Sequence, residues 1–282
     1  MKKAFCMRDC LASEDPCFWL NLVKQGKYKE AWLEIMKVNP LPAVCGYICP
    51  HPCESSCKRI LLDEPIAINN IEKFLGENAI AKGWLPPVLK GDLKPQRIAV
   101  VGSGPSGLSC AYQIARIKYG VTIYESLPVL GGMLRVGIPE FRLPKSVLAK
   151  EINNILDLGV GFQEAILVDH DFLESLKKNY DAVFLAVGLQ KSRKLNIPGE
   201  DNPAALYGLD FLKEVSLGGR VNLGKKVIVI GGGNTAIDVA RTARKTGSEV
   251  SIFYRRTRNE MPAIASEVED HRAVPYQRRD RI

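Results

Sequence analysis

Apolar residues follow two different periods along the 282 residues of this chain, and the change of period divides it into blocks. In the first block, the stretch FWLNLVKQGKYKEAWLEIMKV places its apolar side chains, from Trp19 to Met36, at helical spacing. Gly26 interrupts this pattern and Pro40 ends it. We therefore predict helical structure here, with the second half of the stretch forming a helix that faces a small core.

From residue 97 the rhythm changes to strand, glycine turn, helix and strand. The apolar run RIAVV leads to GSGPSG, LSCAYQIARIKY and VTIYE, and the same order returns at residue 226 as KVIVI, GGGNTA, IDVARTARKT and EVSIFYRR. A continuous apolar strand is what a parallel sheet buried on both faces requires. Between the two units, residues 145–159 and 170–180 each predict a helix, and DAVFLAVG at 181–188 predicts a buried strand.

Two βαβ starts about 130 residues apart predict an α/β protein with two Rossmann-like dinucleotide-binding domains. The prolines at 86 and 87 and Gly91 form a turn-rich linker ahead of the first of them. We expect a helical domain at residues 1–90, a first dinucleotide-binding domain at 91–200 and a second at 201–282.

Composition and charge exclude several classes of protein. Hydrophobic residues make up 46% of the chain, enough for a large core, and no stretch of about eighteen uncharged apolar residues is present to span a membrane. Charges interrupt the N-terminus early, so we expect no signal peptide and a cytoplasmic protein. The formal net charge is +8, but much of the excess lies in RRTR (255–258) and RRDR (278–281) rather than on a basic arm with aromatic residues, which argues against nucleic acid.

The first glycine turn follows a strand and opens a helix, and it consists of Gly102, Ser103, Gly104, Pro105, Ser106 and Gly107. In such a turn the first glycine permits the tight bend, the second lets a pyrophosphate approach the backbone, and the third lets helix and strand pack closely. The phosphates would rest on the helix N-terminus. Glu125 closes the second strand, where a carboxylate accepts hydrogen bonds from an adenosine ribose. The alternative is an ordinary turn that uses glycine for geometry alone.

The second turn fits the pattern G-x-G-x-x-A and consists of Gly231, Gly232, Gly233, Asn234, Thr235 and Ala236. Its second strand ends in Arg255 and Arg256 instead of an acid. A guanidinium can grip a 2′-phosphate through two parallel hydrogen bonds, so we predict NADP(H) as the nicotinamide cofactor, with a solvated arginine surface as the alternative. Because the two turns differ, we predict FAD at the first and NADPH at the second.

Seven of the eight cysteines lie before residue 58, and four of them fall in VCGYICPHPCESSCK at 44–58. In a reducing compartment, clustered thiols favour metal or redox chemistry over disulfides. Thiolates are soft ligands that suit iron–sulfur clusters. A zinc site is the alternative, but the repeated C-x3-C spacing does not match the paired C-x-x-C of structural zinc sites.

Several linked stretches carry a family resemblance: NPLPAVCGYICPHPCESSC, IAVVGSGPSGLSCAY, GGMLRVGIPEFRLPK, AVGLQKSRKLNIPGED, VIVIGGGNTAIDVARTA and YRRTRNEMPA. From about residue 17 to 262 the chain resembles the small subunit of NADPH-dependent glutamate synthase, the N-terminal half of dihydropyrimidine dehydrogenase and the large subunit of bifurcating ferredoxin:NADP oxidoreductase. The resemblance implies a helical domain with two [4Fe–4S] clusters, followed by FAD- and NADPH-binding domains. It also implies flavin contacts by residues of GGML (131–134) and AVG (186–188), namely Gly132, Met133, Leu134, Ala186, Val187 and Gly188.

The same resemblance implies ligands for the clusters. Cys49 and Cys53 would serve one cluster together with Glu72 of AINNIEKF, and Cys57 would cross over to the other cluster. Two four-iron clusters require eight ligands, and the N-terminal region offers eight candidates. These are Cys6, Cys10, Cys17, Cys45, Cys49, Cys53, Cys57 and Glu72.

The resemblance implies an electron-transfer subunit. NADPH would give a hydride to FAD, and single electrons would pass through the clusters to ferredoxin or to a larger subunit of the glutamate synthase or pyrimidine-reducing kind. The alternatives are an inactive truncated fragment or docking subunit and a zinc-dependent nucleic-acid binder. Because relatives continue past the second glycine turn and return to the flavin, we expect both dinucleotide-binding domains to be incomplete at the C-terminus and FAD to be held weakly.

Overall fold

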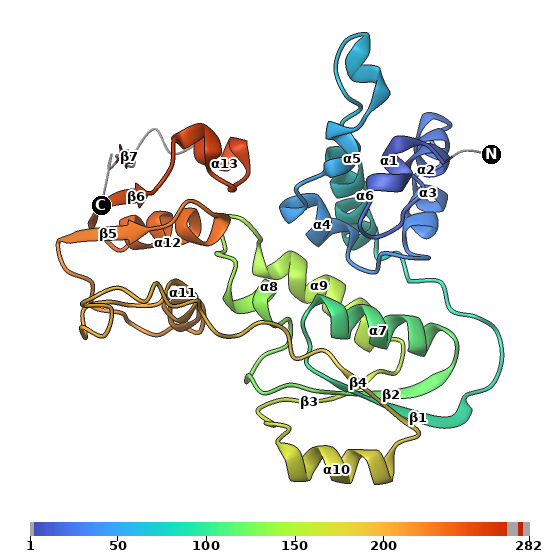
Figure 1. The fold of residues 1–282 in the computed structure, drawn as a ribbon. Coiled ribbons are helices and arrows are strands. Elements are labelled where there is room, and N and C mark those ends of the chain that lie inside the picture. The colour runs from blue at the N-terminus through green and yellow to red at the C-terminus, as the bar shows by residue number, and fades with distance from the viewer. Residues whose placement is uncertain (1–2, 270–275, 279–282) are drawn as a thin grey trace. The chain divides into compact units, whose positions relative to one another are not determined.

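The structure is a computed structural model, and it describes residues 3–269 and 276–278 (Figure 1). The chain divides into two compact units. Unit 1 comprises residues 1–134 and 141–188, and unit 2 comprises residues 135–140 and 189–282.

The first part of unit 1 is helical, as the apolar spacing predicts. Its elements are α1 (Phe5–Asp9), α2 (Pro16–Lys24), α3 (Tyr28–Ile35), α4 (Pro42–Ile48), α5 (Pro52–Ser55), the short 3-10 helix η1 (Lys58–Leu61) and α6 (Ile68–Lys82). Gly26 separates α2 from α3 with a φ of +74°, a conformation that glycine adopts at low cost. Trp19, Trp32 and Leu75 are fully buried and form the centre of this helical layer.

Two glycines let α4 and α6 approach each other until their backbones touch. A Cβ atom at Gly46 would fall on the backbone of Lys73, and one at Gly76 would lie 2.6 Å from the Cα atom of Ala43. Since α4 carries Cys45 and α6 carries Glu72, this close packing brings the cysteine helix next to the buried acid.

The rest of unit 1 is a parallel four-stranded sheet in the order β3-β2-β1-β4. Its strands are β1 (Lys94–Val101), β2 (Tyr119–Tyr124), β3 (Gly161–Gln163) and β4 (Ala182–Leu185), and its helices are α7 (Pro105–Arg116), α8 (Met133–Val136, which runs on into unit 2), α9 (Lys145–Leu156) and α10 (His170–Asn179). Figure 1 shows α7 and α9 on one side of this sheet and α10 on the other. The predicted helices at 145–159 and 170–180 are confirmed as α9 and α10.

The burial of two strands differs from the prediction. Residues 182–185 do form a strand, β4, but Phe184 is 40% and Leu185 58% exposed, so the predicted burial is wrong. In the second sheet, Ile228 and Ile230 of β5 are likewise exposed. In the part of the chain that the structure describes, both are edge strands. An edge strand has a neighbouring strand on one side only, so more of its surface meets solvent.

Unit 2 holds a second parallel sheet in the order β5-β6-β7. Its elements are α11 (Gly208–Ser216), β5 (Lys226–Ile230), α12 (Asn234–Lys245), β6 (Glu249–Tyr254), the 3-10 helix η2 (Arg258–Glu260), α13 (Ala265–Glu269) and β7 (Tyr276–Arg278). Leu212, Ile237 and Ile252 are buried and pack in its core. The arrangement of strand, glycine turn, helix and strand predicted at residue 226 is confirmed.

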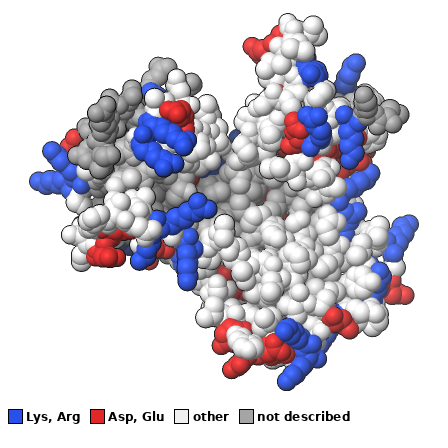
Figure 2. Space-filling view, viewed as in Figure 1, with Lys and Arg blue, Asp and Glu red and all other residues white. Residues whose placement is uncertain are grey.

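The surface carries charges of both signs. In the view of Figure 2, Lys and Arg side chains are interspersed with Asp and Glu. Among the helices that the structure describes, each is too short or too polar to cross a membrane.

Candidate functional site

The first glycine turn connects the carboxyl end of β1 to α7. Gly102 has a φ of +102°, and a Cβ atom there would fall on the carbonyl oxygen of Ala186. A Cβ atom at Gly107 would fall on the carbonyl oxygen of Gly102 and lie 3.3 Å from Cγ1 of Val100. At Gly104, by contrast, a Cβ atom would meet nothing within 4 Å. Two of the glycines are therefore needed for packing, and the backbone at the third is open to an approaching phosphate.

A buried carboxylate holds this turn in place. Glu125 Oε2 accepts hydrogen bonds from the backbone N–H and the hydroxyl of Ser103, at 2.9 and 2.5 Å. Glu125 Oε1 accepts from the backbone N–H of Leu127 at 2.8 Å. The Ser103 hydroxyl oxygen in turn accepts the N–H of Gly131 at 2.9 Å. Glu125 therefore fixes both the glycine turn and the start of the 131–134 segment, and its contact with a ribose stays a prediction.

The segments at 131–134 and 186–188 reach the same edge of the sheet. A Cβ atom at Gly132 would lie 2.8 Å from the Cα atom of Gly104, and the N–H of Ala186 donates to the carbonyl oxygen of Val101 at 2.8 Å. The carboxyl edge of a parallel sheet is where such folds bind their ligands. The structure gathers there the residues Gly102, Ser103, Gly104, Pro105, Ser106, Gly107, Glu125, Gly132, Met133, Leu134, Ala186, Val187 and Gly188.

The second glycine turn connects β5 to α12. Gly231 has a φ of +144°, and its N–H donates to the carbonyl oxygen of Phe253 at 2.9 Å. Asn234 begins α12, and its Oδ1 accepts the N–H of Ile264 at 2.9 Å. At Gly233 a Cβ atom would meet nothing within 4 Å, so this backbone is also open. Thr235 and Ala236 follow in the first turn of the helix.

Two arginines stand beside this second turn. Arg255 and Arg256 directly follow β6 and are exposed. The last residue of β6, Tyr254, packs its ring so closely on the turn that a Cβ atom at Gly232 would lie 2.7 Å from it. The carboxyl edge of the second sheet thus carries positive side chains where the first carries a buried acid.

Four of the cysteines lie on or shortly after two short helices that touch each other. Helix α1 carries Cys6 and is followed by Cys10, and α5 carries Cys53 and is followed two residues later by Cys57. The contact of α1 with α5 brings together the segments that carry these cysteines.

Three sulfur atoms in this region are close enough to influence one another. Burial raises the pKa of the Cys53 thiol to about 12, with further contributions from Glu54 and from the thiols of Cys49 and Cys10. Burial also raises the pKa values of Cys10 and Cys49. Burial therefore disfavours the thiolate form of all three groups, which is the form that binds metal.

Cys17 and Cys45 lie on two other helices, α2 and α4. Cys17 is exposed, and its Sγ lies 3.7 Å from that of Cys6, so the structure brings these two cysteines together. The Cys45 thiol donates to Oδ1 of Asn39 over 3.8 Å. Burial, and then the charge of Glu72, raise the pKa of Cys45 well above its ordinary value.

Glu72 belongs to a buried polar network that the sequence did not predict. Asn39 Nδ2 donates to Oε1 of Glu14 at 2.8 Å and to Oε1 of Glu72 at 2.9 Å, and Asn39 Oδ1 accepts the N–H of Leu41 at 3.0 Å. Burial and then Glu14 raise the pKa of Glu72 well above its ordinary value, because two like charges at this spacing cannot both form. No motif could have revealed this network, since its members come from separate segments of the chain.

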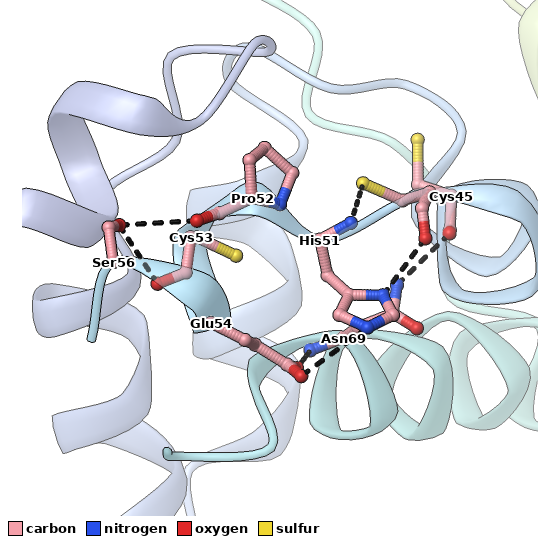
Figure 3. A network of polar contacts seen from close by, with 8 residues as sticks. Cys45, His51, Pro52, Cys53, Glu54, Ser56 and Asn69 are labelled. Atoms are coloured by element: carbon pink, nitrogen blue, oxygen red, sulfur yellow. Dashed lines mark hydrogen bonds and ion pairs between the residues drawn. The ribbon is translucent and has the colours of Figure 1, made fainter. Parts of the chain in front are cut away.

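Hydrogen bonds also connect the cysteine-rich segment 45–57 to α6, as Figure 3 shows. Glu54 accepts the N–H of Asn69 at 2.8 Å, and Asn69 Nδ2 donates to the carbonyl oxygen of Cys45 at 3.1 Å. His51 begins α5 with a φ of +42°, which makes it a turn residue. Its backbone N–H donates to Sγ of Cys49 at 3.3 Å, whereas the sulfur atoms of Cys45 and Cys53 take no part in the bonds drawn.

Across residues 3–269 and 276–278, no group of three or more His, Cys, Asp or Glu side chains is placed to hold a single metal ion. A [4Fe–4S] cluster takes four ligands and is held by thiolates. Soft ligands of this kind are offered by Cys10, Cys49 and Cys53, whose thiols influence one another.

Taken together, these features define a protein in which a cysteine-rich helical domain is followed along the chain by two dinucleotide-binding modules. Residues 96–273 match the pyridine nucleotide-disulphide oxidoreductases, and the chain belongs to this family. Residues 1–84 match the family described as dihydropyrimidine dehydrogenase domain II, 4Fe-4S cluster. These matches confirm the predicted fold class, the class of oxidoreductase and the cofactors FAD, NADP and a [4Fe–4S] cluster.

Curated relatives are considerably longer than this chain. It is 40% identical to the NADP(+)-dependent formate dehydrogenase subunit beta of Moorella thermoacetica, over 95% of this chain and 42% of that protein. It is 41% identical to the NADPH-Fe(3+) oxidoreductase subunit beta of Geobacter sulfurreducens, over 94% of this chain and 40% of that protein. The glutamate synthase [NADPH] small chain of Halomonas elongata confirms the predicted resemblance. It is 35% identical over 90% of this chain and 57% of its own length.

Solved structures agree with the fold. The chain is 29% identical to FprA of Mycobacterium tuberculosis in complex with NADPH, with a TM-score of 0.54 over 63% of this chain and 47% of that one. A 2-naphthoyl-CoA reductase matches 82% of this chain and 34% of its own with a TM-score of 0.59 at 21% identity, a likeness of fold alone.

Proposed function

We propose that NADPH held at the second glycine turn gives a hydride to FAD held at the first, and that single electrons then pass through a [4Fe–4S] cluster to a partner protein. The observation that carries this proposal is that the cysteine helices and the first glycine turn belong to one compact unit. The names of three relatives, which include NADPH or NADP(+), support the choice of donor. We divide the chain accordingly into a cluster domain at 1–90, an FAD domain at 91–200 and an NADPH domain at 201–282.

The first turn would bind the pyrophosphate of FAD. The open backbone at Gly104 and the N-terminus of α7 offer N–H groups and a partial positive charge to phosphate oxygens. Glu125 keeps these groups in place through Ser103. When bound, the flavin supplies the change from hydride to single-electron transfer, which no side chain can perform.

The second turn would bind NADPH. Its backbone is open at Gly233, and the guanidinium groups of Arg255 and Arg256 can hold a 2′-phosphate by charge-assisted hydrogen bonds. Their exposure suits a nucleotide that arrives and leaves at each turnover.

For one cluster, we propose Cys10, Cys49, Cys53 and Glu72 as the ligand set. The charges of Cys49 and Cys10 act on Cys53, and the charge of Glu72 acts on Cys10 and Cys49, which supports placing these four groups around one cluster. The pairing of Cys49 with Cys53 and Glu72 is the one that the resemblance implies. Cys6, Cys17 and Cys57 remain proposed ligands for a second cluster, and Cys45 is a further candidate.

The test is anaerobic reconstitution of the full chain with iron, sulfide and FAD, followed by addition of NADPH. We expect bleaching of the flavin absorbance and about four irons per complete cluster. Cys10→Ser and Cys53→Ser should lose that iron, whereas Cys110→Ser, on α7, should keep it. A flavin that stays oxidised in the presence of NADPH would contradict the proposal.

The electron acceptor is a partner, either a larger catalytic subunit of the glutamate synthase or pyrimidine-reducing kind or ferredoxin, and we propose the cytoplasm as the compartment. The relatives named as beta subunits or small chains support a partner in general terms. Reduction of ferredoxin by NADPH, measured with the reconstituted chain, tests one of these acceptors directly. An absence of ferredoxin reduction alongside rapid dye reduction would exclude it.

A further inference from the structure

The segment that joins α3 to α4 is held at its first end by side chains of the neighbouring sheet domain. Tyr112 is fully buried, and its hydroxyl donates to the carbonyl oxygen of Met36 at 2.8 Å. Arg116 Nη1 donates to the carbonyl oxygen of Lys37 at 2.7 Å. These carbonyls lie at the C-terminal end of α3, where helix carbonyl groups lack partners within the helix. A third donor on α7, Gln113, reaches the Lys37 carbonyl at 3.1 Å.

The same segment is held at its other end by a buried carboxylate. Glu151 of α9 is 3% exposed; its Oε1 accepts the N–H of Ala43 at 2.8 Å and its Oε2 accepts the N–H of Val44 at 2.9 Å. These N–H groups belong to the first turn of α4, which has no side-chain cap of its own. Glu151 thus supplies the missing cap from another domain.

These contacts link the two proposed cofactor sites through rigid elements. Helix α7 begins at the first glycine turn and holds Met36 and Lys37 with residues of its C-terminal half. Helix α4 begins at the cap provided by Glu151 and leads directly to Cys49 at its other end. A shift of either contact would change the position of the cysteines relative to the phosphate-binding turn.

We propose that Tyr112, Arg116 and Glu151 act as positioning residues, forming a clamp on residues 36–44 that fixes the cluster at a constant distance from the flavin. This inference rests on the proposed function, since it assigns those two cofactors to the two sites. The clamp keeps electron transfer between them efficient by removing the freedom of the helical domain to slide or rotate on the sheet domain.

The chemistry of the contacts argues for positioning over simple packing. An apolar side chain at 151 would fill the same space but leave the N–H groups of Ala43 and Val44 without this acceptor, and one at 112 would leave the Met36 carbonyl without this donor. A buried carboxylate is favourable only when its hydrogen bonds are made, and those bonds are directional. A contact of this kind therefore holds one geometry, whereas apolar surfaces tolerate several.

The test compares Tyr112→Phe and Glu151→Gln with the unmodified full chain after reconstitution. Both variants nearly keep the size of the side chain. Tyr112→Phe removes the donor to the Met36 carbonyl, and Glu151→Gln turns an amide donor toward the N–H of Ala43 or Val44. In anaerobic stopped-flow measurements, we expect NADPH to reduce the flavin at the unmodified rate and the following change in cluster absorbance to be slowed about tenfold or more. Hydrogen exchange should also show faster exchange of the Ala43 and Val44 amides in Glu151→Gln.

Tyr180→Phe is the matched control, because its hydroxyl bonds to Tyr124 within the sheet domain and does not touch residues 36–44. Unchanged cluster reduction and unchanged exchange in both clamp variants would overturn the inference. A chain whose flavin ignores NADPH would instead contradict the proposed function, and hydrogen exchange would still test the clamp. If Glu151→Gln folds poorly, Gln113→Ala should show the same slowing to a smaller degree, and its absence would also count against the clamp.

Discussion

The two glycine turns share a motif and differ in what surrounds them. Around the first, Ser103 and Glu125 are buried and bonded to each other, so the turn is built into the interior of its domain. Around the second, Arg255 and Arg256 are exposed, and the following loop is bonded to the turn by the N–H of Ile264, which donates to Asn234, and by the N–H of Ala263, which donates to the Gly232 carbonyl oxygen. The difference teaches that one motif can be built into a buried, hydrogen-bonded turn in one domain and into an exposed, positively charged turn in another.

The largest contrast should come from alanine at the first glycine of each turn. Gly102→Ala places a Cβ atom on the carbonyl oxygen of Ala186, so we expect a loss of about 3 kcal/mol in the free energy of unfolding. Gly231→Ala instead meets the Cβ of Ala236, at 3.2 Å, so it should lose about 1 kcal/mol, which is the cost of a positive φ at a residue other than glycine. Urea unfolding followed by circular dichroism measures both, and equal losses would show that the turns are packed alike.

Removing the acid under the first turn should have the next largest effect. Glu125→Gln retains the size of the side chain but turns a donor toward the N–H groups of Ser103 or Leu127, so we expect a loss of about 2 kcal/mol and less bound FAD. The exposed Glu164 offers a matched control, Glu164→Gln, that should leave stability and flavin content unchanged. Full retention of FAD by the Glu125 variant would argue that the turn holds itself.

The arginines of the second turn should control the choice of nucleotide. Replacing both Arg255 and Arg256 with alanine removes donors to a 2′-phosphate, so we expect NADPH affinity to fall about tenfold or more and NADH affinity to change little. Titration of the reconstituted chain with each nucleotide measures this. Arg193→Ala, at another exposed arginine of unit 2, is the control, and an equal fall for NADH would remove the arginines from the recognition of the 2′-phosphate.

The smallest effect concerns the bond that closes the second turn. Asn234→Ala removes the acceptor for the N–H of Ile264, a part-buried bond, so we expect a loss of about 1 kcal/mol. Hydrogen exchange at Ile264 should become faster. Unchanged exchange would mean that the loop is held by other contacts.

The sequence predicted those features that depend on local spacing. Helices α2 and α3, the strands that precede each glycine turn and the helices that follow were all readable, because apolar period and glycine position are properties of neighbouring residues. The exposure of Leu185 and Ile228 could not be predicted, because the apolar pattern does not tell which strand lies at the edge of a sheet.

Contacts between distant segments were also out of reach. Nothing near Glu14 indicates that Asn39 will bond it, and nothing near residues 36–44 names Tyr112. Glu151 did leave a signal, since it falls among the apolar positions of α9 between Leu148 and Ile152, where an acid is out of place on a buried face. Such an acid needs a partner from elsewhere, and the fold alone reveals which one.

The close approach of α4 and α6 has a consequence for engineering. Because Gly46 and Gly76 leave peptide groups in contact, the spacing between the cysteine helix and Glu72 is set by main-chain atoms and does not depend on side-chain rotamers. Mutational libraries in this layer should therefore leave these two glycines untouched and vary the surrounding side chains, where charge and polarity can change while the spacing of α4 and α6 is kept.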